Sequence, residues 1–205
     1  MSNRYYYHWL LDTDNNPATG RSNAEYEEEP TGVANPIGAE LVAQVGWRDG
    51  KPEEGGVYVY NAMDDSEVLV SHFACQAGGN TLTAVIPLAD LGLELGQTIG
   101  VSAFQEGASD GWATDFIDSA ELTLSPPSDG RMKIDCEFAD WDEAVADPEI
   151  DVAQVDDAAD MADSSGDLKM IYATVENGSL FLRMSVHGVI CPFEDETPDG
   201  MSNRY

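Results

Sequence analysis

The segment DLKMIYATVENGSLFLRMSV, residues 167–186, indicates most directly which kind of fold this chain adopts. Two runs of large apolar and β-branched residues, 167–175 and 179–186, flank the tripeptide Glu176-Asn177-Gly178. Asn-Gly between two strand-like runs is the strongest short-range hairpin signal, because both residues accept positive φ angles. The segment therefore predicts an antiparallel β-hairpin. Asn177-Gly-Ser179 also matches an N-glycosylation sequon, but a tight turn explains both of its first residues.

Short strand patterns of the same kind continue along the rest of the chain. They cover residues 4–11, 40–47, 56–60, 67–73, 81–86, 98–104 and 120–124. Gly, Asp, Asn or Pro bounds each of them, and only residues 87–92 have the pattern of a helical turn. Regular short strands separated by turn residues predict an all-β fold. We expect an antiparallel β-sandwich of the jelly-roll or immunoglobulin-like type.

The two ends of the chain carry the same five residues, MSNRY, at positions 1–5 and 201–205. The difference between 201 and 1 gives a period of 200 residues, which is the size of one or two whole domains. Two explanations are open: the chain is a window cut from a tandem array, or it is an engineered, circularly permuted chain. The array is the better explanation, because no tag or foreign linker is visible.

A Pro- and Ser-rich segment, residues 125–130, interrupts the strand pattern and reads as a linker. In a tandem array, residues 1–124 would be the C-terminal part of one sandwich, and residues 131–205 the N-terminal part of the next copy. The window would then be shifted across a repeat junction. If the copies are separate molecules, completing each sandwich requires strand exchange.

The chain is strongly acidic, with 39 Asp and Glu against 9 Lys and Arg, a formal net charge of -30. Such a surface repels nucleic acid and anionic membranes, so we exclude both as partners. No run of about 18 apolar residues is present, so no membrane span is expected. Cation binding or solvation in high salt both explain the acidity. Disorder fits poorly with 4 Trp, 8 Tyr and 6 Phe.

Catalytic signatures are hard to find, and we predict that the protein is not an enzyme. The histidines lie inside strand patterns, away from any Ser or Cys nucleophile motif. They are His8, His72 and His187. The cysteines have no metal-ligand spacing, and their disulfide state is open. They are Cys75, Cys136 and Cys191.

One motif carries chemistry: DTDNNPATG, residues 12–20. Carboxylate and amide oxygens at alternating positions suit a hard cation that takes six to eight oxygen ligands. The start of the motif is similar to an EF-hand loop, but Pro17 stands where an EF-hand needs Gly, and no helices flank it. A solvated, metal-free Asx turn is the alternative. The metal is favoured because two carboxylates in one tight loop repel each other unless a cation lies between them.

The stretch WLLDTDNNPATG, residues 9–20, resembles the D-x-D-x-N-P-x-T-G loop of extracellular β-sandwich domains related to family 9 carbohydrate-binding modules and the DOMON superfamily. Residues 84–92 resemble the I-P-L-x-x-L-G strand of these domains. Residues 138–141, with the hairpin, resemble their opening segment, which here follows the loop instead of preceding it. The resemblance implies bound Ca²⁺. Its ligands would be Asp12, Asp14 and Asn16, with Glu25 or Glu27 as an acidic partner.

Two functions remain in competition. The first is a structural repeat unit of an extracellular filament, stalk or surface-layer protein at the cell surface, stiffened by calcium, whose partners are neighbouring copies. Contacts between copies are then expected to bury the aromatic strand at Tyr5-Tyr6-Tyr7. The alternative is a carbohydrate-binding module for cell-surface glycans, in which Trp47 and Trp112 stack on sugar rings. Exposure of the aromatic rings distinguishes the two.

Overall fold

The strands of the computed structural model follow the predicted pattern closely. The model describes residues 4–21, 38–48, 51–61, 63–64, 66–108, 114–125, 152–155 and 164–190. Its elements are β1 (Arg4–Asp12), β2 (Leu41–Arg48), β3 (Lys51–Pro52), β4 (Gly55–Asn61), β5 (Ser66–Gly78), β6 (Thr81–Pro87), α1 (Leu88–Leu91), β7 (Thr98–Ala108), β8 (Thr114–Thr123), β9 (Val152–Val155), β10 (Leu168–Glu176) and β11 (Ser179–Val186). Every predicted strand range overlaps an observed strand, whereas β3 and β9 were not predicted.

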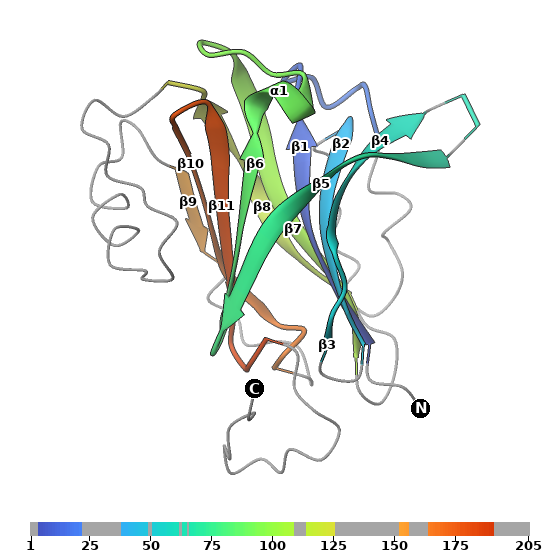
Figure 1. Ribbon diagram of the computed structural model, residues 1–205, viewed down its shortest axis with the longest axis vertical. Coiled ribbons are helices and arrows are strands. Elements are labelled where there is room, and N and C mark those ends of the chain that lie inside the picture. The colour runs from blue at the N-terminus through green and yellow to red at the C-terminus, as the bar shows by residue number, and fades with distance from the viewer. Residues whose placement is uncertain are drawn as a thin grey trace.

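The strands of the described residues form one continuous antiparallel sheet that folds over on itself. Their hydrogen-bonded order is β8-β7-β1-β2-β4-β5-β6-β11-β10-β9, and β3 pairs with β2. The fold-over occurs within β5, since residues 66–73 pair with β4 and residues 74–78 pair with β6. The two ends of the order, β8 and β9, contact each other. The result is a barrel-like, antiparallel β-sandwich, as the sequence predicted (Figure 1).

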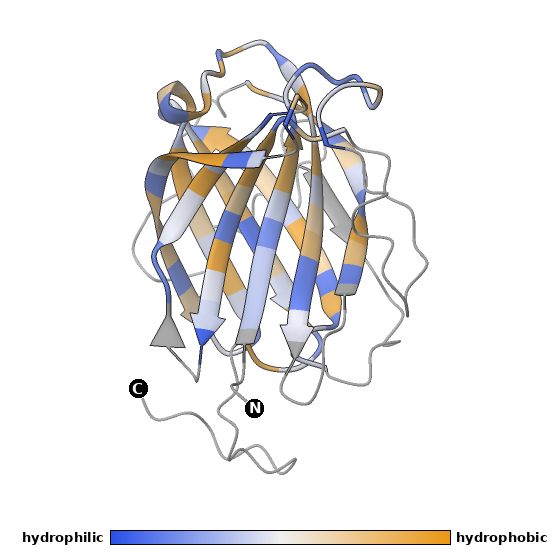
Figure 2. Cartoon of the chain, turned by 90° about the vertical axis from the view of Figure 1, so that its right-hand side faces the viewer, coloured by the Kyte–Doolittle hydropathy of each residue, from blue (hydrophilic) through white to orange (hydrophobic). Residues whose placement is uncertain are grey.

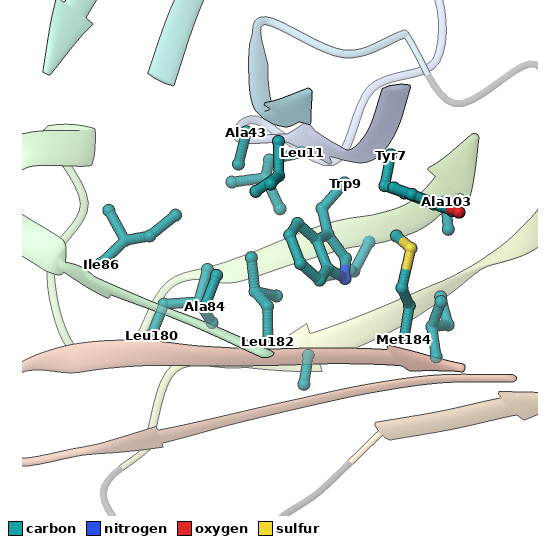
Figure 3. Close-up of a cluster of buried hydrophobic side chains, with 14 of the residues drawn as sticks. Tyr7, Trp9, Leu11, Ala43, Ala84, Ile86, Ala103, Leu180, Leu182 and Met184 are labelled. Atoms are coloured by element: carbon teal, nitrogen blue, oxygen red, sulfur yellow. The ribbon is translucent and has the colours of Figure 1, made fainter. Parts of the chain in front are cut away.

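The inner faces of the two layers meet in one hydrophobic core. Alternate side chains of β1, from Tyr5 to Leu11, point into this core and are at most 1% exposed. Figure 3 shows Trp9 of β1 pointing toward Leu182 and Met184 on β11 of the opposite layer. Apolar and polar residues alternate along the strands, which appears as bands in Figure 2. Burial of each large apolar side chain stabilises the fold by about 1.5–3 kcal/mol.

The outer face of β1 is buried as well, under a second apolar cluster. Leu10 packs there with Phe104 and Phe116, whose ring centroids are 4.8 Å apart. β1 is therefore a central strand that is covered on both faces, which explains its nearly continuous run of aromatic and apolar residues. Tyr5 and Tyr7 are buried in the core of the sandwich, and Tyr6 on the outer face of β1 is 9% exposed. The expectation that they form contacts between copies is therefore wrong.

The predicted β10–β11 hairpin is confirmed. Glu176 and Ser179 are the last paired residues, and the two residues between them form the turn. Asn177 has a φ of 50° and Gly178 a φ of 77°. Two successive positive φ angles define a type I′ turn, whose twist matches that of the flanking strands.

Strands from both sides of the predicted linker share the core of this chain. β11 pairs with β6, so residues after 131 complete the sandwich formed by residues before 124. The same pairing results if β9–β11 precede β1 in a tandem copy, because only the connection between strands differs. The division into parts of successive copies therefore stays a prediction. Most of the linker, residues 126–130, lies outside the described residues.

Candidate metal site

The pairing of β1 with β2 places two carboxylates side by side at one end of the sandwich. Leu11 pairs with Leu41, so Asp12 follows the paired region and Glu40 precedes it. The Glu40 amide donates a hydrogen bond of 3.1 Å to the Leu11 carbonyl, which continues the ladder by one step. Two residues that are distant in the sequence therefore meet at the start of the loop that carries the DTDNNPATG motif.

Hydrogen bonds from the backbone shape this loop. The Asn16 amide donates to Asp12 Oδ1 at 3.0 Å, and the Ala18 amide donates to Asn16 Oδ1 at 3.2 Å. The Thr19 amide donates to the Asn16 carbonyl at 3.0 Å, which closes a tight turn. Asp and Asn favour such turns because their short side chains accept bonds from amides two to four residues ahead. The loop is thus folded by its own motif.

Two glycines hold the loop against the segment that carries Glu40. Gly20 and Gly38 have φ angles of 66° and 68°. A Cβ on Gly20 would lie 2.4 Å from the Gly38 carbonyl oxygen, and one on Gly38 would lie 2.5 Å from the Thr19 carbonyl oxygen. No side chain fits between backbones this close. A bridge between Arg21 and Ala39 fixes the contact.

Carboxylate oxygens of three residues converge within this frame. One oxygen from each of Asp12, Asp14 and Glu40 lies within 4.8 Å of the others. Asp12 is buried, Glu40 is half-buried and Asp14 is exposed, so the cluster opens to solvent on one side. These three residues can hold a metal ion. Ligands on opposite sides of a Ca²⁺ ion lie about 4.8 Å apart, since each Ca–O distance is about 2.4 Å.

The hydroxyl of Thr19 provides a test of whether a cation fits. Its oxygen lies 3.0 Å from both carboxylate oxygens of Asp14, 3.0 Å from Glu40 Oε1 and 2.9 Å from the Asn16 carbonyl oxygen. A hydroxyl has one proton and donates to one acceptor at a time. The remaining contacts therefore bring oxygen lone pairs together. A cation among these oxygens turns that repulsion into attraction, so the residues fit a metal.

The electrostatics of Asp12 agree with this reading. Burial raises the pKa of Asp12, and the neighbouring charges of Glu40 and Asp14 raise it further, whereas the hydrogen bond from the Asn16 amide lowers it. Without a counter-ion, ionisation of Asp12 is therefore less favourable in the folded protein than in the unfolded chain. Glu40 is held in place by the amide of Thr13, which donates to its Oε2 at 2.8 Å.

The structure brings together some of the predicted ligands and adds others. Asp12 and Asp14 lie in the cluster as the motif suggested. Asn16 turns its backbone carbonyl toward Thr19, while its side-chain oxygen accepts the Ala18 amide. Glu25 and Glu27 lie outside the described residues.

Glu40 and the Thr19 hydroxyl were missed by sequence reasoning. Glu40 was assigned only to the start of a strand, 28 positions after Asp12. The register of β1 against β2 would have identified Glu40. In an antiparallel pair, the residue before the second strand lies opposite the residue after the first strand. The acidic character of position 40 at the head of an apolar run was the only local sign.

The tryptophans do not form a sugar-binding platform among the described residues. Trp47 is 4% exposed and packs edge-on against Tyr7, with ring centroids 6.3 Å apart. The assignment of Trp47 to carbohydrate stacking is therefore wrong, because its alternating position on β2 faces the core. Trp9 is fully buried, and Trp112 lies outside the described residues.

A hollow of ≈ 270 Å³ lies beside the metal loop, residues 12–20, between this loop and strands β7 and β8. Asp12 and Pro17 line it on one side, and Gly100 and Glu121 on the other. The side-chain amide of Asn15 donates to Glu121 at 3.0 Å across its rim. Solvent therefore reaches the site, and the loop is tied to β8.

Cys75 is the one cysteine among the residues that the structure describes. It is a free thiol, and burial raises its pKa. Within the described part of the chain, no helix has the length and apolarity needed to cross a membrane. Comparison with protein-family models, with curated proteins and with solved structures gives no match for this chain. The geometry of the acidic cluster is therefore the basis on which a function can be proposed.

Proposed function

We propose that this protein is a calcium-binding β-sandwich module with a structural role in an extracellular assembly of repeated copies. The observation that carries the proposal is the Thr19 hydroxyl, surrounded by acceptor oxygens of Asp14, Asn16 and Glu40. The cluster offers only oxygen ligands, which are those that hard cations take. Neither a histidine nor a cysteine belongs to it.

Ca²⁺ suits these ligands better than Mg²⁺. The cluster combines three carboxylates with a backbone carbonyl and a hydroxyl, all supplied by the protein. Ca²⁺ accepts such irregular sets of six to eight oxygens, whereas Mg²⁺ demands an octahedron and usually keeps several waters. The family resemblance of the loop, which implies Ca²⁺, supports the same choice.

Calcium would act here by linking two neighbouring parts of the fold. The loop ends at Arg21, whose guanidinium makes an ion pair with Glu67 and lies 5.9 Å from the centre of the Tyr60 ring. The Tyr60 amide donates to the Glu40 carbonyl at 2.9 Å. An ion held by Asp12, Asp14 and Glu40 would therefore steady the β1–β2 end and the β4–β5 hairpin together.

A structural role is favoured over carbohydrate binding. The described tryptophans lie in the core, where they stabilise the sandwich and offer no ring to a ligand. The repeated MSNRY ends support a tandem array, and calcium sites that stiffen such arrays suit the millimolar Ca²⁺ of the extracellular space.

Thermal unfolding with and without calcium tests the proposed ion. At a Ca²⁺ concentration 100 times the dissociation constant, binding adds about 2.7 kcal/mol to the free energy of unfolding. We expect the melting temperature to rise by about 5–10 °C for a chain of this size. Asp14→Asn should remove the response, and Asp118→Asn, which changes an exposed acid on β8 outside the cluster, should keep it. Equal melting curves in Ca²⁺, Mg²⁺ and excess chelator would rule out the calcium site.

The proposed array is tested by the size of the intact natural polypeptide in denaturing electrophoresis. The chain of 205 residues, which is one period plus the five repeated residues, has a mass of 22.1 kDa. A mass many times larger supports covalent copies. A species of one period leaves non-covalent association as the only route to an assembly.

A further inference from the structure

The turn between β10 and β11 carries a motif that the calcium site does not use, and we propose that Asn177 is the attachment site of an N-linked glycan. Residues 177–179 are Asn-Gly-Ser, which has the form N-x-S/T with a residue other than Pro in the middle. No other asparagine of the chain begins such a sequence. The proposal rests on the extracellular location proposed above, because this acceptor sequence is used in secreted chains.

The hairpin itself explains only the first two residues of the motif. Asn177 and Gly178 occupy the two turn positions, with positive φ angles of 50° and 77°. Ser179 is the first residue of β11, where it lies opposite Glu176 in β10 and Pro87 in β6. Its hydroxyl makes no hydrogen bond with the described residues, so the fold does not require a serine there. The hydroxyl is the group that completes the acceptor sequence.

Asn177 lies where a modifying enzyme can reach it. Asn177 and Gly178 are exposed, and Ser179 is half-buried. The turn lies at the upper end of the sandwich in Figure 1, and a Cβ added to Gly178 would have no atom within 4 Å. A glycan is bulky and hydrated, so its attachment point has to lie at the surface. The turn meets this condition, whereas the strands below it are largely buried.

The side-chain amide of Asn177 has a hydrogen to give up. An Asn amide nitrogen carries two hydrogens, and one of them is donated to Glu176 Oε1 at 3.2 Å. The second has no acceptor among the described residues. In the transfer, the nitrogen bonds to the anomeric carbon of a sugar carried on a lipid pyrophosphate and loses one proton. The bond from that carbon to the phosphate oxygen breaks, and the lipid pyrophosphate leaves with the electron pair.

Attachment leaves the hairpin unchanged, and the hairpin fixes where the glycan stands. The N–H that remains on the Asn177 side chain can keep its hydrogen bond to Glu176. The Leu88 amide at the start of α1 donates to the Gly178 carbonyl at 2.9 Å, which ties the turn to the body of the sandwich. The glycan would therefore project into solvent from a rigid point beside α1 (Figure 1).

Peptide mapping of the natural polypeptide by mass spectrometry tests the attachment. We expect the peptide that contains Asn177 to carry an oligosaccharide, and enzymatic release of the glycan to leave aspartate at this position. A peptide found only without sugar would overturn the proposal.

Labelling of intact cells separates this result from the proposed function. A polypeptide that lacks sugar but reacts with a label added outside the cell overturns only the glycan. A polypeptide that reacts only after lysis overturns the extracellular role. The calcium response of the melting temperature depends on neither result.

Expression of the full chain with a secretion signal in a eukaryotic host identifies the acceptor. The wild type and Ser179→Thr should both migrate more slowly in denaturing electrophoresis until the glycan is released, because Thr also completes the sequence. Ser179→Ala should lose this shift completely. Made in a host without N-glycosylation, Ser179→Ala and the wild type should melt at the same temperature, since the hydroxyl has no hydrogen bond to lose among the described residues. A wild type without the shift, or a shift that Ser179→Ala keeps, contradicts the assignment.

Discussion

The β10–β11 hairpin and the β1–β2 pair are both antiparallel ladders that bury one face in the same core, but their connections differ completely. Asn177 and Gly178 alone join β10 to β11, whereas residues 13–40 separate β1 from β2. The first pair closes through local turn geometry. The second closes through the metal loop, two crowded glycines and a cluster of carboxylates. The long connection is therefore the place where the proposed ion would contribute to stability.

The largest loss of stability is expected from a glycine-to-alanine substitution in the long connection, and the same substitution in the short hairpin should cost less. Gly20→Ala should destabilise the protein by more than about 3 kcal/mol, since the new methyl group meets backbone atoms of Gly38 and Ala39 at positive φ. Calcium affinity should fall with it, because Gly20 and Gly38 place Glu40 beside the loop. Chemical denaturation and calcium titration measure both.

Gly178→Ala is the matched control in the short hairpin. Its φ of 77° is also positive, but a Cβ there has no atom within 4 Å. The cost is then the backbone strain alone, about 1 kcal/mol, with calcium binding unchanged. If both alanine variants lose the same stability, crowding at the metal loop is not what closes β1 on β2.

A substitution of Asp12 should have a medium effect on the free energy of unfolding, with opposite signs in the absence and in the presence of calcium. Asp12→Asn removes a buried charge next to Asp14 and Glu40, so the calcium-free protein should become about 1 kcal/mol more stable at neutral pH. The same variant should lose the calcium response. Unfolding curves measured with chelator and with Ca²⁺ give the two signs.

The pH dependence of this difference has a defined direction. The folded pKa of Asp12 is raised, so the folded state holds its proton more tightly than the unfolded state does. The wild-type chelated protein thus loses this part of its stability as the pH rises through the folded pKa. The advantage of Asp12→Asn should shrink toward zero as the pH falls below 3.8, the ordinary pKa of an Asp side chain. An advantage that stays constant with pH would remove the electrostatic explanation.

The smallest effect concerns the link between the metal loop and the β4–β5 hairpin. Arg21→Gln breaks the ion pair with Glu67, and such pairs contribute about 0.2–1 kcal/mol at partly exposed positions. We expect a loss in that range, because this ion pair joins the end of the metal loop to β5. Arg48→Gln, which breaks a more exposed pair between Arg48 of β2 and Glu53, is the control and should cost less stability.

Much of the fold was readable from the sequence because its signals are local. Alternating apolar residues marked the strands, and Asn177-Gly178 marked the turn, since each depends on a few neighbouring residues. β9 was missed because it lies in an acidic stretch with few large apolar residues, where partner strands rather than propensity create the strand. The continuation of β5 to Gly78 was missed for a similar reason, because β6 pairs with it there.

Only some of the residues in the candidate metal site could be predicted from the sequence. Asp12 and Asp14 are neighbours in the chain, so their convergence follows from the motif. The contribution of Glu40 depends on the register between two distant strands, and the single proton of the Thr19 hydroxyl has meaning only once its acceptors are placed. The expected acidic partners, Glu25 and Glu27, lie outside the described residues, so their part in the site stays a prediction.

The sequence by itself determined the strands, the tight hairpin and the position of the acidic loop, because backbone preference and side-chain alternation act over a few residues. The tertiary structure decided which faces are covered and which distant groups meet. It buried Trp47, brought Glu40 to Asp12 and left the apolar side chains of Val68, Leu69 and Val70 exposed. Alternation along a strand shows that two faces differ, but only packing against other strands shows which face, if either, reaches solvent.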